Sequence, residues 1–403
     1  MTIDFMRKVD YWAGIPLTAL LTLWIRVVDK LKAKVSYKDV KRVLFIELSE
    51  MGSAILADPA LKRVGKTREI FFVIFKKNAA SLGIFKTVPE KNIFKMRDDS
   101  FLTLVIDVFR FLFWCRKNQI QAVIDLETFS RFTAALSALT GAVIRIGFYN
   151  PRSEGLYRGA ILTHPVGYNP HIHIAKNIVA LTDPLFSSAA GESPLIKRVI
   201  GDDEILLTEV SPPKESVDRV WEAIRRRVKN ISTKFFLVNV NAGDFLPQRK
   251  WPKGSFQEFI KKLIFSNAGV TVLLTGSPKE RPSVDEVALN INSDRCVNIA
   301  GDLRFEDLPA LYSISEGMLT NDSGPGHFAS AVGLKTFVLF GPETPALYGP
   351  LRNATPIYAG LACSPCVHAF NHRNTPCTDN QCLKVINPES VFKQVHQFLI
   401  SRT

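Results

Sequence analysis

Residues 320–327, TNDSGPGH, place an acid, a hydroxyl, two glycines and a histidine just before a small-residue helix and an apolar strand. The strand-like run GMLTND precedes them, so the turn would open a helix, whose free N–H groups and positive dipole end attract anions. Its residues suit a phosphate: Gly324 and Gly326 permit close backbone approach, while Ser323 and His327 can donate hydrogen bonds. Asp322 would repel phosphate and is expected to cap the helix or hold the loop amides. A capped helix with a buried histidine remains the other interpretation.

Four of the six cysteines lie within twenty residues, in the pattern Cys363-x2-Cys366-x10-Cys377-x4-Cys382. Four thiolates can complete a tetrahedral zinc shell, so the pattern predicts a structural zinc site. Its outer spacings are looser than those of common zinc ribbons. Free thiols are the alternative, since disulfides do not persist in a reducing cytoplasm.

Two series of alternating strands and helices are needed to position these residues. The first series of strands is KRVLFIEL, EIFFVIF, QAVIDLE and VIRIGF. The second is KFFLVNV, VTVLLTG, RCVNIAG, GMLTND and TFVLFG. Such alternation is typical of parallel sheets covered by helices, and 403 residues suffice for two domains. Ligands bind beyond the carboxyl ends of such strands.

The first forty residues differ from the rest. Tyr11 to Ile25 is an uncharged run with basic residues on both sides and a tryptophan near each end. As a helix it would extend about 22 Å, short of a bilayer core. It therefore predicts a helix lying in a membrane interface, with a core helix packed on the protein as the alternative.

Composition restricts the partners. The chain is 46% hydrophobic and 22% charged, which excludes a disordered protein, and its formal charge is +13. This charge favours polyanions: anionic lipid, a phosphorylated substrate or nucleic acid. No RNA-binding aromatic signature or helix-turn-helix pattern is present, so we expect no nucleic-acid partner.

Several motifs together resemble glycosyltransferase family 9, which includes the ADP-heptose:lipopolysaccharide heptosyltransferases. They are NDSGPGHFASAVGLKTFVLFGP, VNVNAG followed by RKWP, LLTGSPKE, and VNIAGDLRFEDLPALYSISEGMLTND. The similarity is strong over residues 235–345 and mainly architectural over residues 41–200. It implies an α/β protein of the GT-B fold, with two Rossmann-like doubly wound domains facing a cleft and an apolar, membrane-associating N-terminal helix. The apolar opening WAGIPLTALL also looks like that of several family members.

The resemblance also implies roles for the donor site. Ser323, Gly324, Pro325 and Gly326 would contact the diphosphate, and His327 would reach a phosphate oxygen. Arg249 or Lys250 would supply positive charge, and Glu280 would accept hydrogen bonds from the ribose. Such fixed cations and amides stabilise a leaving nucleoside diphosphate without a metal. The alternatives are a solvated basic pair for Arg249 and Lys250 and a surface acid for Glu280.

The base is less clear, because LSEMGSAILADPAL has Ser53 where the family commonly has an aspartate. A serine of ordinary pKa is not a general base, so we expect the nearby Glu50 to take that role. Asp58 precedes a proline and is expected to begin a helix.

The sequence therefore predicts an inverting, metal-independent transferase at the cytoplasmic face of the inner membrane. It would move a sugar, best taken as heptose, from ADP-heptose or another NDP-sugar to a lipopolysaccharide-core or other lipid-linked acceptor. The alternatives are a transferase of a different NDP-sugar, an epimerase, or a non-catalytic membrane-associated nucleotide-binding scaffold. The expected parts are an N-terminal segment (1–40), an acceptor domain (41–205), a nucleotide-sugar domain (206–386, with the cysteines at 363–382) and a final helix (387–403).

Overall fold

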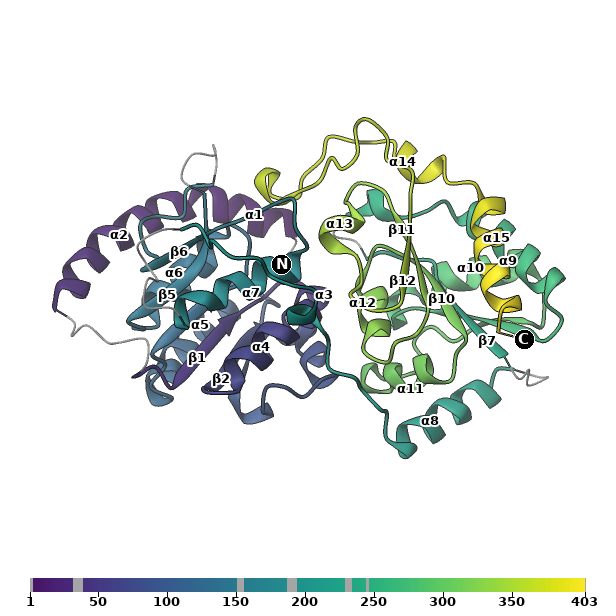
Figure 1. Cartoon of the computed structure of the whole chain (residues 1–403), viewed down its shortest axis with the longest axis horizontal. Helices are drawn as coiled ribbons and strands as arrows, with labels where there is room; N and C mark the ends of the chain where they lie inside the picture. The colour runs from purple at the N-terminus through teal and green to yellow at the C-terminus, as the bar shows by residue number, and fades with distance from the viewer. Residues whose placement is uncertain are drawn as a thin grey trace. The chain divides into compact units, whose positions relative to one another are not determined.

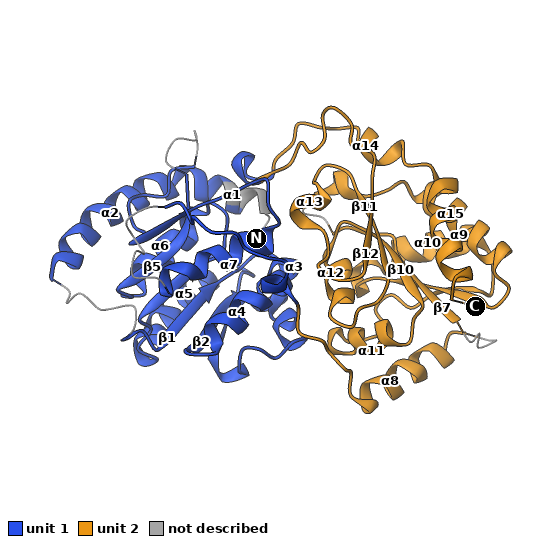
Figure 2. Cartoon of the chain, in the orientation of Figure 1, with its two compact units in different colours: residues 1–206, 369–373 blue, residues 207–368, 374–403 orange. Residues whose placement is uncertain are grey.

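The computed structural model describes residues 3–31, 39–150, 156–186, 194–228, 234–243 and 246–402. The chain forms two compact units (Figure 2): unit 1 comprises residues 1–206 and 369–373, and unit 2 comprises residues 207–368 and 374–403. Each contains one parallel sheet of six strands with helices packed on it (Figure 1), which confirms the predicted pair of α/β domains. Lys32 and Lys34, two of the predicted basic flanking residues, lie outside the described residues.

The sheet of unit 1 has the strand order β3-β2-β1-β4-β5-β6. Its strands are β1 (Arg42–Ile46), β2 (Glu69–Phe75), β3 (Ile93–Met96), β4 (Ala122–Asp125), β5 (Ile144–Tyr149) and β6 (His164–Gly167). Its helices are α1 (Ile3–Trp12), α2 (Gly14–Leu31), α3 (Met51–Leu56), α4 (Asp58–Gly65), α5 (Phe101–Lys117), α6 (Arg131–Leu139) and α7 (Ile174–Thr182). The four inner strands β1, β2, β4 and β5 are buried along most of their length, as expected for a sheet covered on both faces.

The sheet of unit 2 has the order β12-β11-β10-β7-β8-β9. Its strands are β7 (Lys234–Asn239), β8 (Val270–Thr275), β9 (Cys296–Asn298), β10 (Gly317–Asn321), β11 (Thr336–Phe340) and β12 (Ala354–Tyr358). Its helices are α8 (Lys214–Arg225), α9 (Lys253–Ser266), α10 (Arg281–Ile291), α11 (Leu308–Ser313), α12 (Gly324–Ser330), α13 (Pro345–Tyr348), α14 (Gln381–Lys384) and α15 (Pro388–Ile400).

In both sheets, the order in which successive strands are added reverses once. In unit 1 the chain runs outward from β1 to β3 and returns to the other side of β1 with β4; in unit 2 it does the same around β7 and β10. The carboxyl ends of β1 and β4, and of β7 and β10, therefore lie at the switch points where open parallel sheets bind ligands. Each unit thus has one preferred place for a site.

The N-terminal prediction needs revision. No helix in the described part of the chain is long and apolar enough to cross a membrane. Helix α2 packs on α6 and on residues 159–161 through a line of four buried residues, Gly14, Thr18, Thr22 and Ile25. The alternative interpretation, a helix packed on the protein itself, therefore holds for this edge of α2.

Candidate functional site

Asn321, the last residue of β10, organises the switch point of unit 2. Its side-chain amide donates to the carbonyl oxygens of Val240 and Asn241 at 3.1 and 3.3 Å, and its side-chain oxygen accepts from the N–H of Trp251 at 2.9 Å. Trp251 is itself fully buried and donates from its indole nitrogen to the carbonyl of Ile386. The segment after β7 and the RKWP segment are therefore fixed beside the end of β10.

Two buried carboxyl groups and one guanidinium meet at this edge. Arg249 Nη1 lies 3.5 Å from Glu343 Oε2, and the Glu343 and Asp322 side chains hydrogen-bond to each other. Burial raises the pKa of both carboxyl groups, and the neighbouring charge of Asp322 raises that of Glu343 further. Arg249 opposes both shifts. The pair therefore favours retention of a proton, because two adjacent buried carboxylates repel each other.

Four buried side-chain atoms around this edge lack a hydrogen-bond partner within the described part of the chain: Asn241 Nδ2, Gln248 Oε1, Arg249 Nε and Asp322 Oδ2. An unmet buried polar atom costs about 1–3 kcal/mol. Two of these four atoms, Asn241 Nδ2 and Arg249 Nε, are hydrogen-bond donors, which suit phosphate or sugar oxygens. A polar ligand at this edge would provide hydrogen-bond partners for these four atoms. We call Asn241, Gln248, Arg249 and Asp322, together with Asn321, Glu343 and His327, the unit 2 cluster.

The turn 320–327 lies where the sequence placed it, at the start of α12. Ser323 is the N-cap in extended backbone, and its hydroxyl donates to the carbonyl of Asn321 at 3.1 Å without capping the helix. Pro325 lies in the first helical turn, and His327 is buried. Neither Gly324 nor Gly326 has a positive φ, so the turn does not use a backbone conformation restricted to glycine. Gly324 is small for another reason: a Cβ there would lie 3.0 Å from the Phe328 ring.

Two further predicted donor residues have structural roles. Asp322 was expected to cap α12, but the N-cap is Ser323 and the Asp322 carboxyl hydrogen-bonds to Glu343. Glu280 accepts from the N–H and hydroxyl of Ser277 at 2.7 and 2.8 Å in a capping box. Lys250 is half-buried next to Arg249, and its carbonyl accepts a hydrogen bond from Asn380.

The switch point of unit 1 gathers acidic side chains. Glu127, just after β4, accepts from the N–H groups of Leu48 and Ser49 at 3.0 Å and from the Ser49 hydroxyl at 2.6 Å. Glu47 follows β1 directly, and its carboxylate accepts from the N–H of Glu50 at 3.3 Å. With Asp125 at the end of β4, these residues form what we call the unit 1 cluster: Glu47, Glu50, Asp125, Glu127 and Arg373.

Burial governs the protonation of this cluster. The pKa of Glu47 is raised well above its usual value, first by burial and then by the charges of Glu127 and Asp125. Burial also raises the pKa of Asp125 to about 6, although its ion pair with Arg158 acts in the opposite direction. Glu47 and Asp125 are almost inaccessible to solvent, which leaves Glu50 as the more accessible acid of the β1 loop.

Glu50 forms an ion pair with Arg373 and accepts a hydrogen bond from the Ser53 hydroxyl at 3.3 Å. The structure thus brings together the two residues predicted for the base position. Arg373 belongs to the segment 369–373, which is part of unit 1 although it follows the strands of unit 2 in sequence (Figure 2). Phe370 of this segment packs against Phe129 and Tyr168.

The structure does not support the predicted zinc site. In the described chain, no group of three or more His, Cys, Asp or Glu residues is arranged to hold a metal ion. None of these four cysteines forms a disulfide, and they differ in burial, with Cys363 exposed and Cys382 buried. Cys366 accepts from the Thr375 hydroxyl, and the Cys377 thiol donates to the Asp379 carbonyl. These local contacts agree with the free-thiol alternative.

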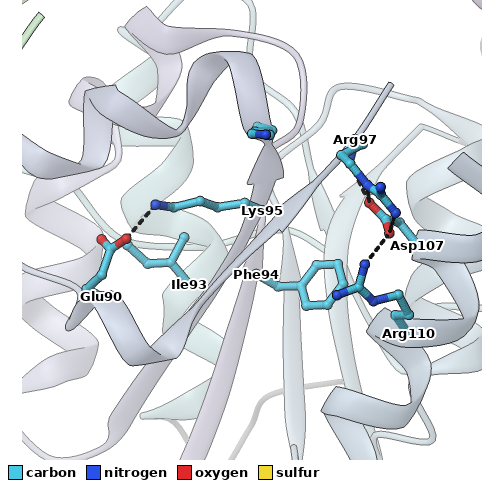
Figure 3. A pocket seen from close by; sticks show the side chains of 8 residues that line it. Glu90, Ile93, Phe94, Lys95, Arg97, Asp107 and Arg110 are labelled. Atoms are coloured by element: carbon cyan, nitrogen blue, oxygen red, sulfur yellow. Dashed lines mark hydrogen bonds and ion pairs between the residues drawn. The ribbon is translucent and has the colours of Figure 1, made fainter. Parts of the chain in front are cut away.

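A pocket elsewhere in unit 1 shares no residue with either cluster (Figure 3). It is lined by Lys76, Glu90, Ile93, Phe94, Lys95, Arg97, Asp107 and Arg110. Its acids are already neutralised: Glu90 pairs with Lys95 at 2.5 Å, and Asp107 pairs with Arg97 at 2.7 Å and Arg110 at 3.2 Å. We assign it no part in the candidate site.

Sequence reasoning missed several members of the two clusters: Glu47, Asp125, Glu127, Asn241, Gln248, Asn321, Glu343 and Arg373. A detectable signal existed for Glu47 and Asp125, which are acids at the ends of apolar strand runs. No signal existed for Arg373, which is more than 300 positions from Glu50 in the sequence.

The fold and the two clusters together describe a protein of two α/β units. Each unit has a six-stranded parallel sheet with polar groups at its switch point. The family model of glycosyltransferase family 9 (heptosyltransferase) matches residues 110–375. The chain therefore belongs to glycosyltransferase family 9, which confirms the predicted resemblance.

Relatives and solved structures agree with this assignment. Lipopolysaccharide heptosyltransferase 2 of Salmonella typhimurium is 30% identical over 159 residues, or 39% of this chain and 44% of that protein. The match thus spans less than half of that relative's length. The structure of E. coli ADP-heptose lipopolysaccharide heptosyltransferase II has a TM-score of 0.68 at 18% identity, covering 90% of this chain and 99% of that one. A family 9 glycosyltransferase from Veillonella parvula gives 0.69 at 19% identity, covering 92% and 100%. At these identities the structures support the fold alone.

Proposed function

We propose that this protein transfers heptose from ADP-heptose to a lipopolysaccharide-core or other lipid-linked acceptor. The observation that carries the proposal is the match to family 9 across residues 110–375, which include the unit 2 cluster up to Glu343. The Salmonella typhimurium relative is a lipopolysaccharide heptosyltransferase, and the similar E. coli structure is that of an ADP-heptose lipopolysaccharide heptosyltransferase. We take the fold to be GT-B.

The unit 2 cluster would bind the donor. The backbone of residues 323–326 and the His327 ring would contact the diphosphate, with Arg249 or Lys250 neutralising its charge and Glu280 accepting from the ribose hydroxyls. As the bond between the anomeric carbon and the phosphate oxygen breaks, negative charge accumulates on the leaving nucleoside diphosphate. Fixed cations and N–H donors stabilise that charge most in the transition state, so this step needs no metal.

The unit 1 cluster would activate the acceptor. Glu50 removes the proton from the acceptor hydroxyl while the oxygen attacks the anomeric carbon opposite the leaving diphosphate, which inverts its configuration. Arg373 holds the Glu50 carboxylate through their ion pair, and Ser53 donates to it. Ser53 does not act as base, because a serine of ordinary pKa keeps its proton.

We place the reaction at the cytoplasmic face of the inner membrane, where a lipid-linked acceptor would be presented. The formal charge of +13 supports this location, because it favours an anionic surface.

Transfer is tested with purified protein, ADP-heptose and a lipopolysaccharide-core acceptor lacking its outer heptose. We expect release of ADP and an acceptor mass increased by one heptose, with UDP- and GDP-sugars inactive. If the protein transferred sugar only from another donor, that sugar would replace heptose in the proposal. Nucleotide binding without transfer from any donor would favour the non-catalytic scaffold.

A further inference from the structure

Helix α2 has an unusual distribution of side chains between the protein and its surroundings. Its buried edge consists of Gly14, Thr18, Thr22 and Ile25, so three of these four residues are small or hydroxylated. Its opposite face exposes large apolar side chains. A surface helix in water normally shows the reverse order, with its apolar stripe against the core.

The buried edge is tightly fitted. A Cβ at Gly14 would lie 2.8 Å from the Arg131 side chain, and one at Gly159 would lie 2.6 Å from the Thr22 hydroxyl. The Thr18 and Thr22 hydroxyls donate to carbonyls one turn earlier at 2.8 and 2.7 Å, and Thr22 also accepts from the N–H of Ala160 at 2.9 Å. These contacts fix the rotation of α2, so its large side chains cannot turn inward.

The outward face of α1 and α2 comprises Trp12, Leu20, Leu23, Trp24, Val27 and Leu31. Leu31 is 83% exposed, Trp12 75%, Leu20 65%, and both Leu23 and Val27 62%. Single exposed apolar residues are ordinary, but six on two consecutive helices indicate a surface that is covered in use. Trp12 ends α1 and Trp24 lies within α2, and exposed tryptophan is typical of helices lying at the level of lipid headgroups.

Charge identifies the occupant. The described acids of α1 and α2 point toward unit 1: Asp10 accepts from the N–H of Phe132 at 2.7 Å, and Asp29 pairs with Arg145 at 2.5 Å. Lys8, Arg26 and Lys30, by contrast, are exposed. The two helices thus present apolar and cationic groups outward and keep Asp10 and Asp29 paired with the rest of unit 1, which is complementary to an anionic lipid surface rather than to a neutral protein face.

We propose that the outward face of α1 and α2 lies in the interface of an anionic membrane, with its apolar residues among the acyl chains and its basic residues at the headgroups. The helix does not need to cross the bilayer for this. The inference gives a structural basis to the membrane location of the proposed function, on which it rests for its biological setting.

Vesicle co-sedimentation of the full chain tests this without nucleotide or acceptor. Two vesicle types are compared, pure phosphatidylcholine and phosphatidylcholine containing phosphatidylglycerol. We expect at least tenfold stronger binding to the anionic vesicles, weakened by salt. The variant Leu20→Ser/Leu23→Ser/Val27→Ser should lose tenfold or more on both vesicle types. The variant Lys8→Gln/Arg26→Gln/Lys30→Gln should lose its preference for anionic lipid.

The matched control is Phe265→Ser/Leu289→Ser, which removes two exposed apolar side chains from unit 2 and should bind vesicles like the unaltered chain. Unchanged thermal midpoints and ADP affinity would show that all variants fold. Vesicle binding that survives the triple serine variant, or is absent in the unaltered chain, overturns the proposal. A lipid-free dimer that the triple serine variant dissociates assigns the face to a second copy instead. Because ADP binding and transfer are measured separately, failure here leaves the proposed function standing.

Discussion

Glu50 is the residue on which the proposed chemistry depends most. It occupies the loop after β1, is paired with Arg373, and is more accessible than Glu47 or Asp125. A base needs access to the acceptor as well as a suitable pKa, so burial argues against the other two acids.

Glu50→Gln should lower kcat by about 10²–10⁴-fold, because general-base assistance is lost while the donor cluster in unit 2 is untouched. Transfer rates and ADP affinity measured on the same protein separate these effects. Ser53→Ala, which removes a single hydrogen bond to Glu50, should cost far less. Wild-type turnover in Glu50→Gln would exclude it as the base.

Glu343 makes stability depend on pH. Its pKa is raised in the folded chain, so folded Glu343 binds a proton more tightly than unfolded Glu343. Raising the pH from near its ordinary pKa through the higher folded value therefore removes stability. Glu343→Gln cannot titrate, so its unfolding midpoint should fall less than that of the unaltered chain between about pH 5 and pH 8. The surface substitution Glu286→Gln is the control, and equal slopes for both variants would contradict the assignment.

At the scale of elements, the segment 369–373 is the most consequential feature. It fixes Phe370 among the aromatic rings of Phe129 and Tyr168, and thereby Arg373 beside Glu50. Arg373 is a positioning residue in this scheme, because it acts through Glu50.

Arg373→Ala should lower kcat about tenfold or more while leaving ADP affinity unchanged, because Arg373 belongs to unit 1. Arg373→Lys keeps the charge and should restore part of the rate. A change in donor KM with unchanged kcat would instead place Arg373 in donor binding.

Asn321 links three segments at the end of β10, and its loss should affect both stability and binding. Asn321→Ala leaves the buried N–H of Trp251 and two carbonyls without their partner, so we expect about 2–3 kcal/mol lower stability of unit 2. ADP affinity should fall with it. Denaturant unfolding and calorimetric titration measure the two effects, and Asn267→Ala, in the loop after α9, is the control for loss of an asparagine outside the cluster.

Burial explains which strands could be predicted from the sequence. Central strands such as β1, β2, β7 and β8 are apolar runs and were predicted near their observed limits. Strands β3, β6 and β12 were not predicted, and all three are edge strands. β6 (HPVG) and β12 (ATPIY) contain proline, which edge strands tolerate, and β3 includes Lys95. The strand-to-helix turn at residues 320–327 was predictable because its residues are contiguous, whereas the Glu50–Arg373 pair joins distant segments.

At the scale of the whole molecule, the two clusters belong to separate units and should respond separately to ligand. ADP is expected to slow amide hydrogen exchange at residues 246–251 and 321–328, because it would satisfy the unpaired polar groups of the unit 2 cluster. Residues 47–53 of unit 1 should exchange at the same rate with and without ADP. Protection confined to unit 1 would move the donor site to the other sheet.

The segment 369–373 also limits how related genes can exchange their halves by recombination. The chain passes between units at residues 206/207, 368/369 and 373/374. A recombination event near residue 206 would replace unit 2. It would also replace Arg373, whose ion-pair partner Glu50 lies in the part of the chain that is kept. Exchange of donor specificity between related genes would therefore succeed only when the incoming half supplies an equivalent of Arg373. Glu50 and Arg373 should for this reason vary together among close relatives of this chain.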